Sequence, residues 1–236
     1  MSHEAPIPKR HPVRFDPFVA HVAAWIEHLG ERLSADVHEA ERFLHLLDPD
    51  ADAFAFRCFS QTPYTRRPGG DPLEQECIVP LREAWPRIIR LNRQGAGIAV
   101  AINAIEGRRR TAANVVRIRA LFADLDRPLE TWPDPLPPPH MWIESSPGKA
   151  HLYWLVEGIP LDAFLPLQKG ICRLLHSDDR VNGLAQAMQL PGLWHRKDPR
   201  HPHQVRIRTC LDRPRYTLSE LAHHAATPAV DIRVPG

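Results

Sequence analysis

The feature that most constrains the fold is an apolar-rich run at residues 115–123 that ends in two aspartates, Asp124 and Asp126. A run rich in Val, Ile, Leu and Phe, stopped by Arg127 and Pro128, predicts a buried strand. Residues two apart on a strand point to the same face, so both carboxylates leave the sheet side by side. Mg²⁺ or Mn²⁺ would relieve their repulsion, which outlines a phosphoryl- or nucleotidyl-transfer site. The alternative is a strand-end pair of solvated acids.

Composition places the chain among ordinary globular proteins. Of 236 residues, 43% are hydrophobic and 25% charged, and the 25 prolines favour many rigid loops. The four cysteines are scattered without a C-x₂-C pair, and no signal peptide precedes them, which indicates reduced thiols in the cytoplasm and argues against structural zinc. No stretch approaches the ~20 apolar residues that a membrane span needs.

Periodicity along the chain predicts an α+β fold with a mixed, partly antiparallel sheet. We expect a flexible arm at 1–14, an N-terminal helical and α+β part at 15–95, a catalytic core at 96–210, and a C-terminal helix and tail at 211–236. Helices are expected at 16–30, 35–47, 81–94, 161–175 and 218–225, with a short helical turn at 184–189. Strands are expected at 53–59, 97–105, 141–144, 151–156 and 205–209.

A second motif joins the strands at 141–144 and 151–156. The loop contains Ser145, Ser146 and Lys149, and His151 begins the next strand. Backbone N–H groups, hydroxyls and an ammonium that converge on one loop suit a phosphate chain. The alternative is a plain hairpin turn with a surface lysine.

A third motif follows a Pro-Gly turn, where Trp194 offers an aromatic anchor or base platform and His195, Arg196 and Lys197 offer cationic or hydrogen-bonding groups. A second basic patch precedes the Asp124 strand. Net charge is only +2, yet residues 106–119 hold five arginines against one acid, with Arg108, Arg109 and Arg110 adjacent. Localised basic patches suit a polyanion such as nucleic acid, and solvated surface arginine is the alternative.

Taken in order, the runs 119–126, 144–154 and 190–197 resemble the RepB-type DNA primase domain of plasmid and phage replication proteins, in the archaeo-eukaryotic primase superfamily. The resemblance covers about residues 96–209. It implies a core related to the RNA-recognition fold, with catalytic Asp124 and Asp126 binding Mg²⁺ or Mn²⁺. Carried over by position, the other implied contacts are Ser146, Lys149 and His151 with the incoming nucleotide, and Arg196 and Lys197 with phosphates or template. The hairpin loop adds Ser145 as a nucleotide contact. The basic patch and the third motif give the expected DNA contacts, which are Arg108, Arg109, Arg110, Trp194 and His195.

One departure concerns a third acid that relatives carry before the Leu-Pro-Gly turn. Gly183 stands at that position here, after Asn182, and Asp178 and Asp179 come a few residues earlier. Either the alignment slips and Asp179 is a third ligand, or Asn182 supplies a neutral one, or the site is weakened. Two carboxylates with substrate phosphates can still hold Mg²⁺, so loss of activity does not follow.

These features favour a primase that makes a short primer on single-stranded DNA from nucleoside triphosphates, in plasmid, phage or mobile-element replication. No P-loop is present, so a separate helicase or replication initiator is an expected partner. One alternative is a non-catalytic origin-binding or single-stranded-DNA-binding protein that keeps the fold. Another is a strand-nicking initiator that uses His201, His203 and a nucleophilic Tyr216, although Pro202 between the histidines fits poorly.

Overall fold

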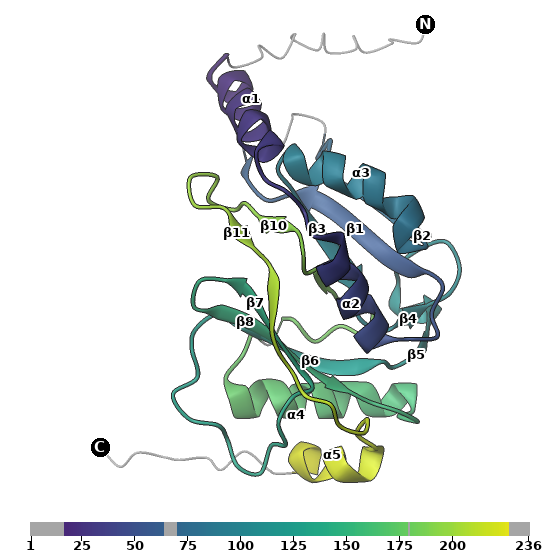
Figure 1. Cartoon of the computed structure of the whole chain (residues 1–236). Helices are drawn as coiled ribbons and strands as arrows, with labels where there is room; N and C mark the ends of the chain where they lie inside the picture. The colour runs from purple at the N-terminus through teal and green to yellow at the C-terminus, as the bar shows by residue number, and fades with distance from the viewer. Residues whose placement is uncertain (1–16, 64–69, 179, 227–236) are drawn as a thin grey trace, which may run out of the picture.

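The computed structural model describes residues 17–63, 70–178 and 180–226, and its main elements are two four-stranded sheets with helices packed on them (Figure 1). The helices are α1 (Pro17–Glu31), α2 (Val37–Leu47), α3 (Leu81–Arg93), α4 (Phe164–Leu175) and α5 (Leu218–Ala226). The first sheet has the order β2-β1-β3-β9, with β1 (Phe54–Ser60), β2 (Gln75–Val79), β3 (Ala96–Ala101) and β9 (Ala187–Gln189). The second has the order β12-β7-β8-β6, with β6 (Ala120–Leu125), β7 (Met141–Ser146), β8 (Lys149–Leu155) and β12 (Arg206–Cys210). Two small ribbons pair β4 (Ala104–Ile105) with β5 (Val115–Arg117), and β10 (Trp194–His195) with β11 (His203–Gln204).

Helix α3 packs on the first sheet through an apolar stripe. Ala84, Ile88 and Leu91 recur at helical spacing and are buried. The chain then turns at Gly95, whose φ of +96° is a backbone conformation that glycine adopts without strain. This turn leads directly into β3, so the strand at the centre of the sheet starts where the helix ends.

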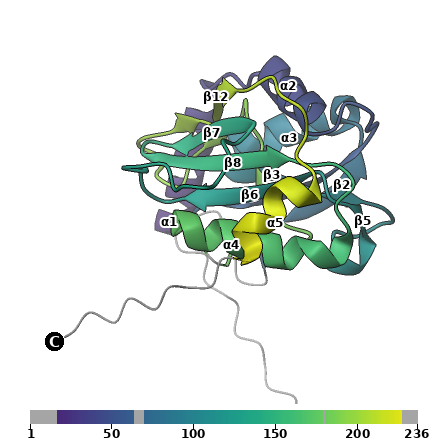
Figure 2. The same ribbon diagram turned by 90° about the horizontal axis from the view of Figure 1, so that it is seen from below.

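Helix α4 packs on β6 of the second sheet, and α5 packs on α4 (Figure 2). Phe164, Leu167 and Ile171 of α4 are buried at i, i+3 and i+7. Gln168 is fully buried and joins the helix to β6, because its Nε2 donates to the Phe122 carbonyl at 2.6 Å and its Oε1 accepts from the Phe122 amide at 3.1 Å. Helix α4 therefore holds the middle of β6 in place.

The start of β6 is fixed by a buried ion pair. Asp48, which caps the end of α2 and is 3% exposed, accepts from Arg119 Nε at 2.5 Å and from Arg117 Nη2 at 2.6 Å. The Arg119 amide donates to Asn103 Oδ1 at 3.0 Å, and the Arg119 guanidinium lies 4.7 Å from the centroid of the Phe54 ring. These contacts join both sheets at the point where the chain enters the strand that carries the aspartates.

The structure confirms an α+β fold with antiparallel sheets and all five main helices, and it corrects four details. The strand expected at 97–105 is divided, because β3 ends at Ala101 in the first sheet and β4 pairs with β5. Residues 115–123 are not one strand: β5 and β6 are separate and pair with different partners, and the Arg119 amide between them donates to the Asn103 side chain instead of to a strand. Residues 184–189 end in strand β9 rather than a helical turn, because Ala187–Gln189 complete the edge of the first sheet. The hairpin turn is limited to Pro147 and Gly148, so both strands are longer than expected.

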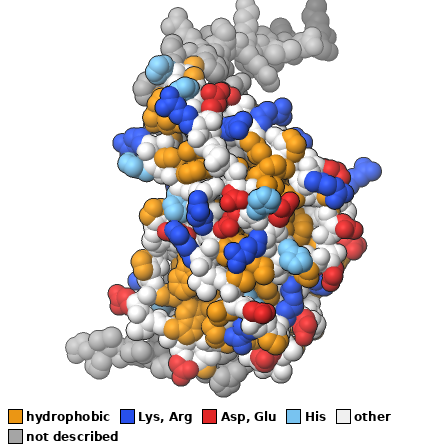
Figure 3. All heavy atoms as spheres, in the orientation of Figure 1, with side chains coloured by type: hydrophobic (Ala, Val, Ile, Leu, Met, Phe, Trp, Pro, Cys, Tyr) orange, Lys and Arg blue, Asp and Glu red, His pale blue; other side chains and the backbone are white. Residues whose placement is uncertain are grey.

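The surface carries no extended patch of one charge on the face seen in Figure 3, where acidic, basic and histidine side chains are interspersed.

Strands β2, β10 and β11 were not expected from the sequence, and the arm at 1–14 lies outside the described residues. Among the described helices, none combines the length and the apolar character needed to cross a bilayer.

Candidate nucleotide-binding site

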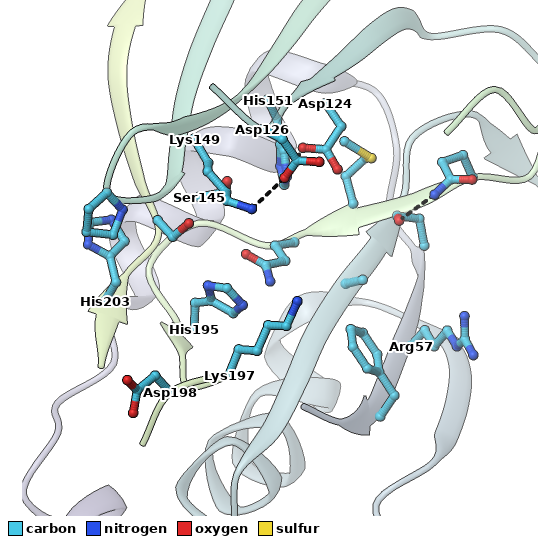
Figure 4. Close-up of a pocket in the computed structure, with 18 of the residues that line it drawn as sticks. Arg57, Asp124, Asp126, Ser145, Lys149, His151, His195, Lys197, Asp198 and His203 are labelled. Carbon is cyan, nitrogen blue, oxygen red and sulfur yellow. Dashed lines mark hydrogen bonds and ion pairs between the residues drawn. The ribbon is translucent and has the colours of Figure 1, made fainter. Parts of the chain in front are cut away.

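A cavity of about 810 Å³ is lined by residues of both sheets and of the segment around β10 and β11. Asp124, Asp126, Lys149 and His151 lie together on one side, and Arg57 lies across the cavity (Figure 4). The lining residues that the sequence analysis had selected come from every motif: Asp124, Asp126, Ser145, Ser146, Lys149, His151, His195, Lys197 and Arg110. Residues far apart in the chain thus meet at one concave place.

Asp124 and Asp126 lie at the end of β6, two residues apart, and both line the cavity. Burial, together with the charges of Asp126 and Asp178, raises the pKa of the Asp124 carboxyl to about 6, against the opposing effect of Lys149. The Lys149 ammonium donates to Asp126 Oδ1 at 2.5 Å. Negative charge is concentrated here, and one cation already neutralises part of it.

The β7–β8 hairpin supplies the groups next to this pair. His151 is opposite Asp124 in the β6–β8 register, and its Nε2 lies 3.6 Å from Asp124 Oδ1. Burial lowers the pKa of His151 to about 4, so its imidazole is neutral near pH 7, and its buried Nδ1 has no hydrogen-bond partner. Ser146 and Lys149 flank the turn, where Gly148 has a φ of +75°. The hairpin therefore presents a hydroxyl, an ammonium and a neutral imidazole to the cavity.

The segment around β10 reaches the cavity after a fixed turn. Gly192 has a φ of +85°, and a Cβ atom there would lie 2.1 Å from the Asp36 carbonyl oxygen, so only glycine fits. His195 and Lys197 then line the cavity on alternate positions of an extended segment. Burial, together with the charge of neighbouring Lys197, lowers the pKa of His195 to about 4. His195 is therefore a neutral hydrogen-bonding group beside a cationic lysine.

Arg196 points the other way, which corrects the expectation that it contacts nucleotide or template. It is 1% exposed, and its guanidinium donates to the carbonyls of Asn92 and Arg93 at the end of α3 and of Ile26 in α1. Trp194 also lies outside the cavity lining, and its Nε1 donates to the Ser34 carbonyl at 2.8 Å. Both residues anchor the segment that carries His195 and Lys197.

The three adjacent arginines are divided by the structure. Arg108 and Arg109 are exposed and do not line the cavity. Arg110 does, but its guanidinium donates to Glu76 Oε1 at 2.9 Å and to the Ala185 carbonyl at 2.7 Å. Its charge is already paired, so only the first two remain candidates for phosphate contacts.

Gly183, where the resemblance expects a third acid, does not line the cavity. Asp179 lies outside the described residues. Asp178 is the acid whose charge reaches Asp124, and its amide donates to the Asp124 carbonyl at 3.4 Å, although its own carboxylate bonds to Arg180. Within the described ranges no group of three or more His, Cys, Asp or Glu side chains is arranged to hold a metal ion.

The donor set of Asp124 and Asp126 nevertheless fits a hard divalent cation. Carboxylate oxygens are the ligands that Mg²⁺ and Mn²⁺ prefer, and one or two carboxylates with substrate phosphates suffice for Mg²⁺. The raised pKa of Asp124 means that its ionised form is unfavourable without a nearby positive charge. The ammonium of Lys149 on Asp126 shows that a cation is accommodated at this edge.

Sequence reasoning missed the opposite wall of the cavity, formed by Arg57, Phe59, Ala99 and Gln189. The signal was the alternation of residues 54–59, which puts Arg57 and Phe59 on one face of β1 and Phe56 and Cys58 on the other.

The sequence also gave no sign that Tyr216 is unsuitable as a nucleophile. Its side chain is 2% exposed and its hydroxyl donates to the Pro138 carbonyl at 2.9 Å, so the strand-nicking alternative has no support.

Three solved structures are similar to this fold. The AEP domain of the cyanophage S-2L primase-polymerase superposes with a TM-score of 0.64 at 19% identity, over 82% of this chain and 100% of that domain. Primase RepB′ superposes with a TM-score of 0.59 at 15% identity, over 80% of this chain and 61% of its own length. The catalytic domain of RepB′ in complex with initiator DNA gives 0.56 at 16% identity, over 80% and 92% of the two chains. No family model matches the sequence, and no curated protein matches it.

Proposed function

We propose that the chain is a primase-type nucleotidyltransferase that synthesises a short primer on single-stranded DNA from nucleoside triphosphates, with Mg²⁺ or Mn²⁺. The observation that carries the proposal is the convergence of two carboxylates, an ammonium, a hydroxyl and two neutral imidazoles on one cavity. The fold supports it, because the similar structures are named as primases and a primase-polymerase. A plasmid, phage or mobile-element origin, and a helicase on another chain, belong to the same proposal.

In the proposed reaction a 3′-hydroxyl oxygen attacks the α-phosphorus of the incoming nucleotide and pyrophosphate leaves, so the protein chiefly positions the groups and offsets charge. Asp124 and Asp126 would hold the metal ion, which neutralises phosphate charge when bound. Lys149 and Lys197 would bind the triphosphate through charge-assisted hydrogen bonds. His151 would add a directional hydrogen bond, because its neutral imidazole has one N–H to donate.

The test is primer synthesis by the purified protein on single-stranded DNA with ribo- or deoxynucleoside triphosphates and Mn²⁺. Asp124→Ala and Asp126→Ala should each abolish product formation and retain a cooperative thermal transition. Asp212→Ala removes an exposed carboxylate outside the cavity lining and is the matched control. Synthesis at the wild-type rate in either cavity variant would refute the assignment.

A second candidate is a DNA-binding protein that keeps the fold without catalysis. The lack of a third ligand beside Asp124 and Asp126, within the residues that the structure describes, favours it. The same experiment separates the two functions, since this candidate predicts that the wild type binds single-stranded DNA and makes no primer under any nucleotide or metal condition.

A further inference from the structure

The wall opposite the aspartates has a distinct surface. In the register of the first sheet, Arg57 is opposite Ala99, Ala99 is opposite Gln189, and Phe59 is opposite Gly97. Residues two apart on a strand share a face, so these five positions form two adjacent rows on the cavity side. Small residues occupy the middle strand, and larger ones flank them. The wall therefore carries one aromatic ring, Phe59, among smaller side chains.

Phe59 lies across β3 because Gly97 leaves room for it. A Cβ atom on Gly97 would lie 2.9 Å from Phe59 Cζ, closer than real Cβ contacts. The ring is partly exposed in the cavity, and the Arg57 guanidinium lies 5.5 Å from its centroid. The tip of the ring approaches Gly97 and the Arg57 guanidinium lies over the ring. A partly exposed ring and guanidinium that line a cavity form a surface on which another π-system can pack.

The charges of this wall cancel. Arg57 pairs with Glu74 at 3.2 Å, and Arg110 pairs with Glu76 at 2.9 Å. The wall therefore differs from the side that carries Lys149 and Lys197, and it offers phosphates no net attraction. Arg57 Nε also faces Glu76 Oε1 at 4.0 Å, so this wall presents paired guanidinium groups and small side chains around the ring. An aromatic surface whose flanking charges are paired suits a nucleobase rather than a sugar-phosphate chain.

We propose that Phe59 is a stacking platform for a base of single-stranded DNA bound along the β1–β3 wall. Arg57 lies across the cavity from Lys149 and Asp126, so a strand on this wall faces the place proposed for the triphosphate (Figure 4). The inference that this strand is the template rests on the proposed function, whereas stacking by Phe59 does not.

The experiment measures single-stranded DNA affinity by fluorescence anisotropy over a range of salt concentrations, without nucleotide or metal. Phe59→Ala and Phe59→Leu should weaken binding by about 5- to 150-fold, because stacking of one base on an aromatic side chain has that value. Phe59→Trp should bind as tightly as the wild type or more tightly. The slope of log affinity against log salt should be unchanged, because no phosphate contact is lost. Wild-type affinity in Phe59→Leu would mean that the ring only fills space and would overturn the proposal.

Two further arms make the result specific. Gly97→Ala crowds both the Gln61 side chain and the tip of the Phe59 ring, and it should weaken DNA binding in the same direction. Gln61→Ala removes the other crowded side chain and is its control, because it should leave stacking on Phe59 unchanged. A scan with a single abasic position along the oligonucleotide should find one site at which Phe59→Ala has no further effect. If Phe59→Ala instead weakens nucleoside triphosphate binding and leaves DNA binding unchanged, the occupant is the incoming base and the template assignment is wrong. A wild type that makes no primer but shows the Phe59 effect would refute the proposed synthesis alone.

Discussion

Replacing Asp124 by Asn should make the protein more stable, because the wild-type carboxylate is held where its ionised form is unfavourable. The pKa of Asp124 is raised from 3.8 to about 6 by burial and by the charges of Asp126 and Asp178. At about 1.4 kcal/mol per pH unit, this difference corresponds to roughly 3 kcal/mol at neutral pH. Since 28% of the side chain is exposed, solvent screens part of it, and we expect a gain of about 1–3 kcal/mol.

The pH dependence has a definite sign. Below the unfolded pKa of 3.8, Asp124 is protonated in both states and the substitution gives no electrostatic gain. As pH rises from 3.8 to about 6, the unfolded state loses its proton first, so wild-type stability falls relative to Asp124→Asn. The gain of the variant therefore develops over this interval and stays constant at higher pH.

Thermal and urea unfolding in chelator at several pH values measure the effect. For a chain of this size the gain corresponds to a midpoint about 2–12 °C higher. Excess Mn²⁺ should stabilise the wild type more than Asp124→Asn, so the difference between their unfolding midpoints should disappear or change sign. Asp198→Asn is the control, because Arg200 and His201 lower the pKa of that carboxyl and its removal should bring no gain. An Asp124→Asn variant no more stable than the wild type at neutral pH would refute the reasoning.

Three further predictions concern the ion pairs and the imidazole. Asp48→Ala leaves the 5%-exposed Arg119 without its carboxylate and should cost about 3–5 kcal/mol, with a smaller loss for Asp48→Asn, measured by urea unfolding. Lys149→Met removes the ammonium from Asp126 and should raise Mn²⁺ affinity while it weakens nucleoside triphosphate binding; calorimetric titrations in which both affinities fall would contradict this. Because the pKa of His151 is about 4, the binding loss in His151→Ala, about 0.5–1.5 kcal/mol, should be the same from about pH 6 to pH 8.

Local patterns predicted the helices and the cavity motifs because these depend on nearby residues. Helices α2, α3 and α4 carry apolar residues at helical spacing, and α2 and α3 end near Pro49 and Gly95, so periodicity was sufficient. The i, i+2 placement of Asp124 and Asp126 likewise depends only on strand geometry. The structure places both side chains on the cavity, as that geometry requires.

Long-range features were not accessible in the same way. The break between β5 and β6 depends on Asp48, about seventy positions earlier. The surroundings of Phe59 depend on the register of β1 with β3, which places Phe59 opposite Gly97. Arg196 is different, because the signal was present: on an extended segment its side chain must point away from His195 and Lys197. Grouping all three as cationic contacts ignored that alternation.

The buried guanidinium of Arg196 makes the N-terminal helix part of the cavity's support. Removing α1 would take away the Ile26 carbonyl and expose a cation that now lies among helix carbonyls. His195 and Lys197, on either side of Arg196, line the cavity, so loss of α1 would displace these two side chains. A shortened chain that begins after Glu31 is therefore not a minimal version of this protein, whatever its other elements retain.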